Sequence, residues 1–238
     1  MVETNMKNIA LLIDADNASH HGIDPVLTVL AELGQVNIRR AYGNWAKPAL
    51  SNWNKISHRY GLQPVQQFDL TKGKNATDIA MTIDAIDLLN DGKVDGFGIM
   101  SSDSDFTPLV TRLRQDGLIV YGFGSEKAPQ AFKTACTRYI DVDQLIRTSN
   151  ADEKTGASAD AKMDQELVEL LGGAWKASKR DDEGYARLHE VGQIAGNRSS
   201  FDVRNYGYKR LSDMMRAASE HFKMERRDDG QLYVRRLR

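Results

Sequence analysis

The strongest constraint on the fold is a regular alternation of short apolar runs with helical patterns through the first 123 residues. Short apolar runs between polar or glycine-containing segments predict buried strands, and apolar residues three and four apart predict helices. Strands that alternate with helices form a parallel sheet with right-handed crossovers, so we expect a doubly wound α/β domain with strand order 3-2-1-4-5. The predicted strands cover residues 8–13, 36–42, 63–68, 96–101 and 118–123, and the predicted helices cover residues 25–33, 49–60, 76–90 and 106–115.

The last third of the chain has a different pattern. It predicts helices over residues 164–176, 186–194 and 209–219 and two short strands over 222–227 and 232–236. The sequence Asp228-Asp229-Gly230 suits the turn of a hairpin between those strands. Three helices followed by a hairpin outline a small winged helix-turn-helix domain.

A small, polar segment at residues 149–162 lacks apolar periodicity and predicts a flexible linker. We therefore expect one domain over residues 1–148 and a second over 163–238. Residues 1–149 carry 15 Lys and Arg against 17 Asp and Glu, whereas residues 162–238 carry 16 against 13. The basic excess of the second part is compatible with nucleic acid and equally with a solvated surface.

Cysteine usage and the N-terminus limit the compartment. Cys136 is the only cysteine, which excludes an intrachain disulfide and a zinc cluster of several thiolates. The first residues lack the basic start and apolar run of a signal peptide, and no apolar run reaches the ~18 residues of a membrane span. We expect a cytoplasmic protein that does not enter a membrane.

Aspartates stand at the positions where an open α/β sheet builds its sites, namely the carboxyl ends of its strands. Asp14 directly follows the first strand, and Asp103 follows the fourth strand, which we expect beside the first. Asp105 opens the next helix, and Asp78 lies in the first turn of the helix over residues 76–90. Crowded carboxylates repel one another unless a cation lies among them, and oxygen ligands favour Mg²⁺ or Mn²⁺. The sequence predicts one metal site made by these four aspartates.

Each aspartate also has a structural interpretation. Asp105 can cap a helix, Asp78 can interact with a helix dipole, and Asp14 can form a turn. Asp103 and Asp14 have the fewest such alternatives, because they directly follow strands. Asp84 and Asp87, on the same helix as Asp78, are six and nine residues beyond it, which predicts solvated positions away from its face.

Other polar residues near the four aspartates are candidates for supporting roles. Asp16 and Asn17 are close enough to Asp14 to reach a metal through water or to fix the ligand loop. Lys74 and Arg40 are candidates for binding a substrate phosphate, with surface charge as the alternative. Ser101 and Ser102, at the end of the fourth strand, can donate hydrogen bonds to ligand carboxylates or to the scissile phosphate, and we favour Ser102 because it is nearer to Asp103.

Three segments carry a family resemblance. The sequences Leu11-Leu-Ile-Asp-Ala-Asp-Asn17, Thr71-Lys-Gly-Lys-Asn-Ala-Thr-Asp78 and Gly98-Ile-Met-Ser-Ser-Asp-Ser-Asp105 resemble the NYN domain, the LabA-like branch of the PIN nuclease superfamily. The resemblance covers about residues 5–147. It implies a Rossmann-like, PIN-like sheet and Mg²⁺- or Mn²⁺-dependent RNA cleavage, with the four aspartates at the acidic positions of the family.

The second domain resembles the OST-HTH, or LOTUS, domain, a winged-helix module associated with RNA. The segment Tyr206-Gly-Tyr-Lys-Arg-Leu-Ser-Asp-Met-Met215 carries this resemblance. Basic and aromatic residues there can contact phosphates and stack on bases. The candidates for RNA binding are Arg204, Tyr208, Lys209, Arg210 and Arg227. A wing that binds a protein partner is the alternative, because Asp228 and Asp229 lie on the same hairpin.

These observations lead to the hypothesis of a metal-dependent endoribonuclease with a C-terminal RNA-binding module. The alternative is a catalytically weak RNA-binding or regulatory adaptor, in which the acids support the fold or bind a metal without turnover. A phosphatase or a DNA nuclease is a third possibility. The sequence leaves the RNA target and the oligomeric state open.

Overall fold

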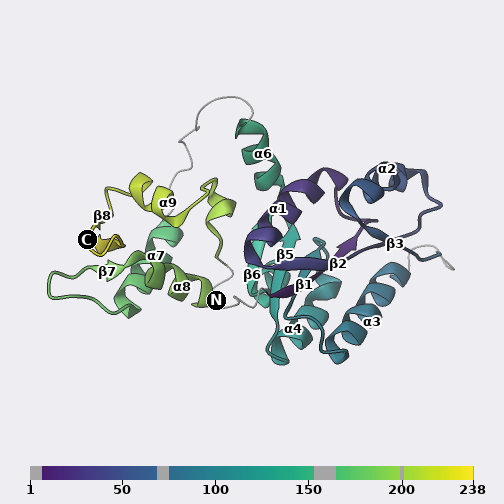
Figure 1. Cartoon of the computed structure of the whole chain (residues 1–238), viewed down its shortest axis with the longest axis horizontal. Helices are drawn as coiled ribbons and strands as arrows, with labels where there is room; N and C mark the ends of the chain where they lie inside the picture. Colours follow the sequence, from purple (N-terminus) through teal and green to yellow (C-terminus); the bar gives the residue numbers. More distant parts are fainter. Residues whose placement is uncertain (1–6, 69–74, 153–164, 199–200, 238) are drawn as a thin grey trace, which may run out of the picture. The chain divides into compact units, whose positions relative to one another are not determined.

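The computed structural model describes residues 7–68, 75–152, 165–198 and 201–237. The chain divides into two compact units, Met1–Ser149 and Asn150–Arg238. Figure 1 shows the helices and strands of both units, and each unit has its own hydrophobic core.

The first unit is built around a six-stranded parallel sheet of order β3-β2-β1-β4-β5-β6. The predicted order 3-2-1-4-5 is confirmed and extended by one strand. Sequence analysis missed β6 because it is a short edge strand, and it missed the six-residue helix α5 before it. The strands are β1 (Asn8–Asp14), β2 (Gln35–Gly43), β3 (Gln63–Gln66), β4 (Gly96–Met100), β5 (Ile119–Gly124) and β6 (Arg138–Asp141).

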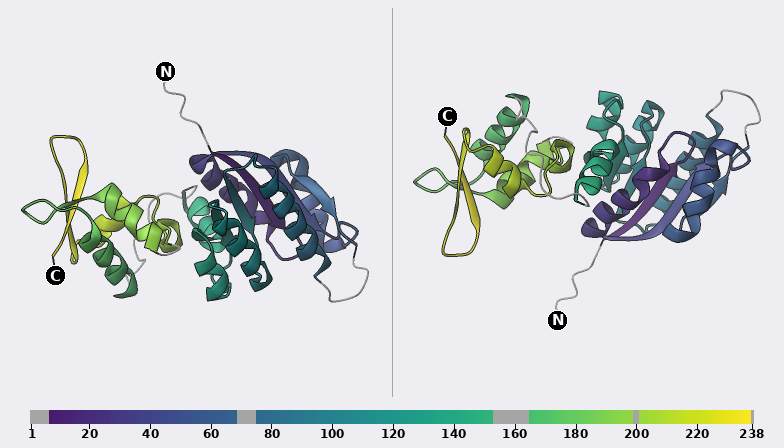
Figure 2. Two further views of the ribbon diagram at one scale, coloured as in Figure 1. Left: turned by 90° about the horizontal axis from the view of Figure 1, so that it is seen from below. Right: turned by 90° about the horizontal axis from the view of Figure 1, so that it is seen from above.

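Helices cover both faces of this sheet (Figures 1 and 2). One core cluster contains residues of α1 (Ile23–Leu33), α2 (Ser51–Tyr60) and α6 (Val142–Asp152). The other contains residues of α3 (Ala76–Asn90), α4 (Thr107–Gln115) and α5 (Gln130–Ala135). Burial on both faces is why the strands have nearly continuous apolar sequences.

Alternation along the central strands decides which side chains meet the α3 face. Ala10 and Leu12 of β1 belong to the core beneath α3 and α4, whereas Leu11 and Ile13 belong to the core on the other face. Because successive side chains of a strand point to opposite faces, Asp14 continues the row that faces α3.

Several predicted elements begin or end differently. The predicted helices over 49–60 and 106–115 each start with a 3-10 turn, η2 (Pro48–Leu50) and η3 (Ser104–Phe106), which continues into α2 and α4. Helix α6 runs to Asp152, so residues 149–152 of the predicted linker are helical. The rest of the predicted linker, and Lys74, lie outside the described residues.

The second unit packs helices against a small antiparallel sheet of order β7-β9-β8. The predicted helix over 186–194 begins instead with the short strand β7, because the buried Ala186 pairs with Val234. Gly230 adopts the left-handed conformation, with φ of 75°, at the predicted hairpin turn. The elements are α7 (Gln165–Ala177), β7 (Ala186–Arg187), α8 (Leu188–Arg198), η4 (Val203–Tyr206), α9 (Leu211–Ala217), β8 (Phe222–Arg226) and β9 (Leu232–Arg236).

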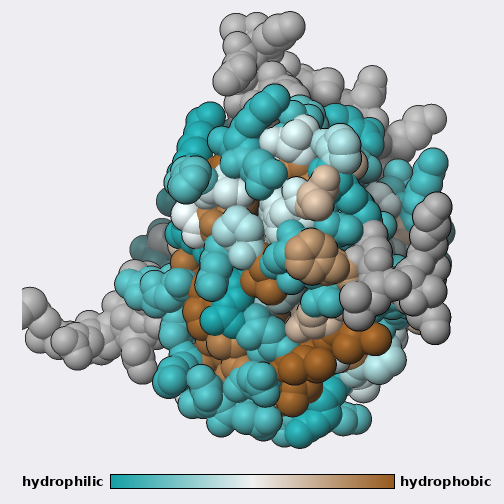
Figure 3. Space-filling view, turned by 90° about the vertical axis from the view of Figure 1, so that its right-hand side faces the viewer, coloured by the Kyte–Doolittle hydropathy of each residue, from teal (hydrophilic) through white to brown (hydrophobic). Residues whose placement is uncertain are grey.

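Among the described residues, no helix is both long enough and apolar enough to cross a membrane. Two exposed apolar side chains, Ile79 and Ile83, lie one turn apart on the outer face of α3. The side of the molecule in Figure 3 is mostly hydrophilic, with a group of apolar residues at its surface.

Candidate metal centre

Asp14 is the buried member of the predicted site. It ends β1, and its side chain is inaccessible to solvent. The Ser101 hydroxyl donates a hydrogen bond of 2.9 Å to Oδ2 of Asp14, and the Asn17 amide donates one of 3.0 Å to the same oxygen. The other oxygen, Oδ1, is buried and has no hydrogen-bond partner among the described residues.

Burial raises the pKa of Asp14, and the hydrogen bonds from Asn17 and Ser101 act in the opposite direction. A buried carboxylate with one unpartnered oxygen is costly in a protein interior. A cation bound to Oδ1 would remove that cost, so the atom fits a metal ligand.

Asp78, Asp103 and Asp105 come together in space from two different parts of the chain. One carboxylate oxygen from each lies within 4.8 Å of those of the other two. Asp78 is in the first turn of α3, whereas Asp103 and Asp105 are at the start of η3, directly beyond β4. The predicted convergence of these three side chains is therefore present in the structure.

Hydrogen bonds fix two of these carboxylates. The backbone N–H of Asp105 donates to Oδ1 of Asp103 at 2.9 Å, so Asp103 caps η3. The Asn75 amide donates to Oδ2 of Asp105 at 2.5 Å, which ties the start of α3 to η3. Capping was the structural alternative for Asp105, but the 3-10 turn begins at Ser104, so Asp103 is the residue at the capping position.

The electrostatics of the cluster favour a cation. The pKa of Asp78 is raised to about 6, mainly by burial and then by repulsion from Asp14, Asp103, Asp105 and Asp16. Of these acids, only Asp103 and Asp105 join Asp78 in the group whose carboxylate oxygens lie within 4.8 Å of one another; Asp14 and Asp16 are outside that group. All the donor atoms are oxygens, which suits Mg²⁺ or Mn²⁺. The residues present fit such a metal.

Asp16 and Asn17 take different supporting positions. Asn17 holds Asp14, as described above. Asp16 accepts a hydrogen bond of 2.9 Å from the Thr77 hydroxyl and pairs with Lys47 at 3.3 Å. Asp16 therefore links the loop after β1 to the first turn of α3, immediately before Asp78. Sequence analysis missed Asn75, Thr77 and Lys47, because nothing in a local pattern indicates partners so far away in the sequence.

The two serines after β4 have different partners. Ser101 contacts Asp14, whereas the Ser102 hydroxyl accepts a hydrogen bond of 2.8 Å from the backbone N–H of Ser125. Alternation along β4 was the signal that could have found this. Phe97 and Ile99 face the core beneath α3, so Ser101 is the next side chain on that face.

Arg40 and Asp84 form a pair that sequence analysis did not anticipate. The Arg40 guanidinium and the Tyr42 hydroxyl both donate hydrogen bonds to the Asp84 carboxylate. The prediction that Asp84 is a solvated helix position is therefore wrong, because the side chains of Arg40 and Tyr42 point from β2 toward α3. A contact between Arg40 and a substrate phosphate stays a prediction, and it would compete with this pair. Asp87 is exposed, as expected.

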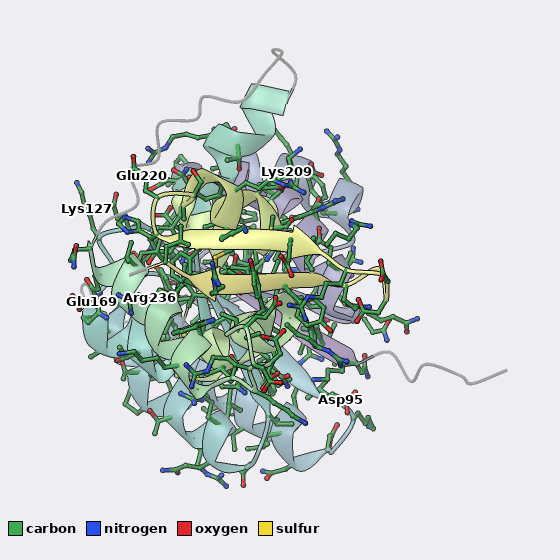
Figure 4. The ribbon with its side chains drawn as sticks, turned by 90° about the vertical axis from the view of Figure 1, so that its left-hand side faces the viewer. Asp95, Lys127, Glu169, Lys209, Glu220 and Arg236 are labelled. Atoms are coloured by element: carbon green, nitrogen blue, oxygen red, sulfur yellow. The ribbon has the colours of Figure 1, made fainter. Side chains whose placement is uncertain are left out.

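The predicted RNA-binding residues of the second unit fall into two groups. Arg204 is held by the buried Asp202 at 2.9 Å, and Arg227 lies among Asp181, Glu225 and Glu183 at 2.5, 2.8 and 3.7 Å. These acids occupy the two guanidinium groups. Three other candidates lie at or before the start of α9: Tyr208 is partly buried, and Lys209 and Arg210 are exposed. Lys209 lies above the β8–β9 hairpin in Figure 4.

Comparison with known protein families decides the classification. The model of the NYN domain matches residues 8–145, more than half of the chain, and this match includes all four aspartates. The chain belongs to the NYN domain family. An OST-HTH/LOTUS domain follows at residues 161–234, so the resemblances that the sequence motifs indicated are confirmed in the same order. NYN domains are PIN-like nuclease domains, and OST-HTH domains are RNA-binding modules.

Two similar proteins carry names that state no function. This NYN protein is 28% identical over 137 residues to the uncharacterized protein MJ0482 of Methanocaldococcus jannaschii, a match that covers 56% of this chain. The match spans about half, 52%, of the length of that relative. A crystal structure of a protein of unknown function, VPA0982 from Vibrio parahaemolyticus, matches with a TM-score of 0.52 and 21% identity. That match covers 61% of this chain and 98% of the other, and it supports the fold alone.

Proposed function

We propose that this NYN protein is a Mg²⁺- or Mn²⁺-dependent endoribonuclease and that its OST-HTH domain retains the RNA. The observation that carries the proposal is the group of three carboxylates within 4.8 Å of one another, together with the buried Asp14, whose charge raises the pKa of Asp78. The residues proposed to hold the cation and to be catalytic are Asp14, Asp78, Asp103 and Asp105.

A divalent cation bound by these aspartates would activate water and neutralise charge on the phosphodiester. The residues around them keep the ligands in place. Ser101 and Asn17 both donate to Oδ2 of Asp14, which leaves Oδ1 for the cation. Asn75 orients Asp105 in a similar way. Loss of such a supporting hydrogen bond typically lowers metal affinity or activity by about 10- to 100-fold.

The proposed substrate is RNA because an RNA-binding family domain follows the nuclease domain. Lys74, which immediately precedes Asn75 in the sequence, remains the proposed phosphate contact on the nuclease domain. Ser102 and Arg40 are also proposed to contact the substrate phosphate. Each already has a hydrogen-bond partner in the protein, which the substrate would have to displace. Binding of a protein partner by the wing also remains a proposal.

The test is cleavage of a pooled RNA library by the full chain, with Mn²⁺ or with EDTA. We expect the wild type to cut RNA with Mn²⁺ and not with EDTA, and Asp14→Asn to lose cutting while keeping its fold. Asp87→Asn is the matched control, because Asp87 is exposed on α3 and lies away from the carboxylate cluster.

Two results would overturn the proposal. Cutting that continues in Asp14→Asn at the wild-type rate would mean that another site or a contaminant is responsible. Intact RNA after incubation of the wild type with Mn²⁺, together with equal RNA binding by the wild type and Asp14→Asn, would indicate an adaptor instead.

A further inference from the structure

The OST-HTH unit contains a hollow whose lining includes none of the predicted RNA-binding residues. Its volume is about 280 Å³, close to the lower end of the range for small-molecule pockets, roughly 300 to 1,000 Å³. This size suits one nucleotide of a single strand. The lining residues are Lys179, Arg180, Asp181, Tyr185, Arg187, Glu190 and Tyr233.

A tight turn before β7 builds one wall of the hollow. Arg180 forms an antiparallel bridge with Ala186, and the Asp181 carboxylate accepts hydrogen bonds from the backbone N–H groups of Glu183 and Tyr185 at 3.0 and 2.8 Å. Gly184 completes the turn with a φ of 83°, a conformation that favours glycine. The cationic residues on either side of this turn therefore stand on a fixed backbone.

Strand β9 builds the facing wall. Arg187 of β7 pairs directly with Tyr233 of β9, and the neighbouring pair, Ala186 and Val234, is buried. Side chains alternate along a strand, so Arg187 and Tyr233 share the outer face of this sheet. Nε of Arg187 also donates to the Tyr233 hydroxyl at 3.3 Å.

The cations of the hollow are available to an anion. Lys179, Arg180 and Arg187 are exposed, and the Arg180 guanidinium stacks over the Trp175 ring at 4.7 Å. A stacked guanidinium keeps its N–H edge for a phosphate. The two acids of the lining are already engaged, since Asp181 pairs with Arg227 and Glu190 accepts a hydrogen bond of 2.8 Å from the backbone N–H of Lys179.

A second hollow on the same unit has the opposite charge. Its lining contains five acidic residues and two arginines: Asp181, Asp182, Glu183, Glu225, Arg226, Arg227 and Asp228. A phosphate chain would be repelled there, because Arg227 is already neutralised by Asp181 and Glu225. The charge distribution directs RNA to the first hollow.

We propose that the hollow between the Arg180 turn and β9 binds a segment of single-stranded RNA. Arg180, Arg187 and Lys179 contact its phosphates. The Arg227 guanidinium lies over one face of the partly exposed Tyr233 ring at 4.5 Å, so a base stacks on the opposite face. Base stacking on an aromatic ring combined with a cationic border is the usual basis of single-strand binding. The inference rests on the proposed function for its choice of ligand, and it places the RNA contact away from Lys209 and Arg210.

The test uses the full chain and a fluorescently labelled pool of single-stranded RNA, with anisotropy measured in EDTA so that cleavage does not interfere. In the variant Arg180→Ala/Arg187→Ala we expect Kd to rise about tenfold or more at physiological salt. The slope of log Kd against log salt should fall by about 1.4, since each phosphate contact to a single strand contributes about 0.7. Arg216→Ala is the matched control, because Arg216 is exposed on the same unit, pairs with Asp213 at the surface and does not line the hollow.

The aromatic residue gives an independent arm. Tyr233→Leu should weaken binding about tenfold, whereas Tyr233→Phe keeps the ring and should bind as the wild type does. Lys179→Glu is a second charge variant that does not alter the turn. Circular dichroism of each variant verifies the fold.

The proposal is overturned if these variants bind RNA as the wild type does, or if Lys209→Ala/Arg210→Ala is the variant that weakens binding. Failure of the nuclease proposal gives a different result. In that case the wild type binds RNA through the hollow in EDTA and cuts none of it with Mn²⁺.

Discussion

Replacing Asp78 with asparagine should stabilise the metal-free protein. In the wild type, this carboxylate is partly buried beside other acids, and its pKa is raised to about 6 from an ordinary value of 3.8. Near neutral pH the Asp78 carboxylate is ionised in the folded protein, although its surroundings favour the protonated form. This ionisation lowers the stability of the folded state. Asp78→Asn removes the charge and keeps a side chain of nearly the same shape.

The expected gain follows from the size of the pKa shift. About two pKa units at roughly 1.4 kcal/mol per unit give an upper limit of about 3 kcal/mol for the free energy of unfolding. Asp78 is only partly buried, so solvent screening reduces this to about 1 to 1.5 kcal/mol. For a chain of this size the melting temperature should rise by about 3 to 5 °C.

The gain should depend on pH in a defined direction. Below the unfolded pKa of 3.8, the folded and unfolded states both bind the proton, and the substitution gains nothing. The penalty of the wild type grows as pH rises and is complete above about 6, the folded pKa. The gain should therefore be full at about pH 7.5 and fall to about a third of that value at about pH 4.5.

The assay is thermal and urea unfolding in EDTA at both pH values, with Asp87→Asn as control. That substitution removes the same charge from the same helix at an exposed position, so it should change stability by less than about 0.5 kcal/mol. With Mn²⁺ present, the wild type should gain stability and Asp78→Asn should gain less, because it has lost a ligand. Equal gains for the two asparagine variants, or a larger gain at the lower pH, would refute the reasoning.

Three further substitutions test the surroundings of the site. Ser101→Ala removes a buried donor to Asp14 and should cost about 1 to 2 kcal/mol in urea unfolding, with a matching loss of Mn²⁺ affinity by calorimetry. Gly124→Ala would place a methyl group 2.5 Å from the Ser101 carbonyl oxygen, so we expect a loss of about 1 to 3 kcal/mol and slower cleavage; a wild-type melting temperature would contradict the packing. Asp84→Asn should cost about 1 to 2 kcal/mol, and a double-mutant cycle with Arg40→Gln should give a coupling energy above about 0.5 kcal/mol, whereas additivity would mean that the pair is not formed.

Much of the first unit could be predicted from the sequence, because local patterns carry the information. Strand and helix periodicities depend on neighbouring residues, and α3 begins and ends where those patterns predicted. Right-handed crossovers then fix the order of the central strands. The edge strand β6 has only four residues, and its pairing with β5 determines it more than its own sequence does.

The position of the carboxylates was also predictable, since parallel strands end at one edge of the sheet. Asp14 and Asp103 follow neighbouring strands, so their approach depends on topology rather than on details of packing. To identify the serine that supports Asp14, one must know which face of β4 each serine lies on. Alternation indicated Ser101, but proximity in the sequence to Asp103 suggested Ser102, and the proximity was misleading.

Only the tertiary structure decided the partners of the charged side chains. Arg40 and Asp84 are 44 residues apart, and their meeting depends on how α3 rotates and slides over β2. In the second unit, the sequence shows Arg227 only as a basic residue, whereas in the structure three carboxylates from two segments surround it.

The sequence alone thus determined the α/β alternation, the order of the first five strands and the four strand-end and helix-start aspartates, because periodicity and chain direction are local properties. The tertiary structure decided which charges are paired and which face the solvent. Charged side chains pair when elements that are distant in the sequence pack together, and a local sequence pattern does not show which elements pack against each other.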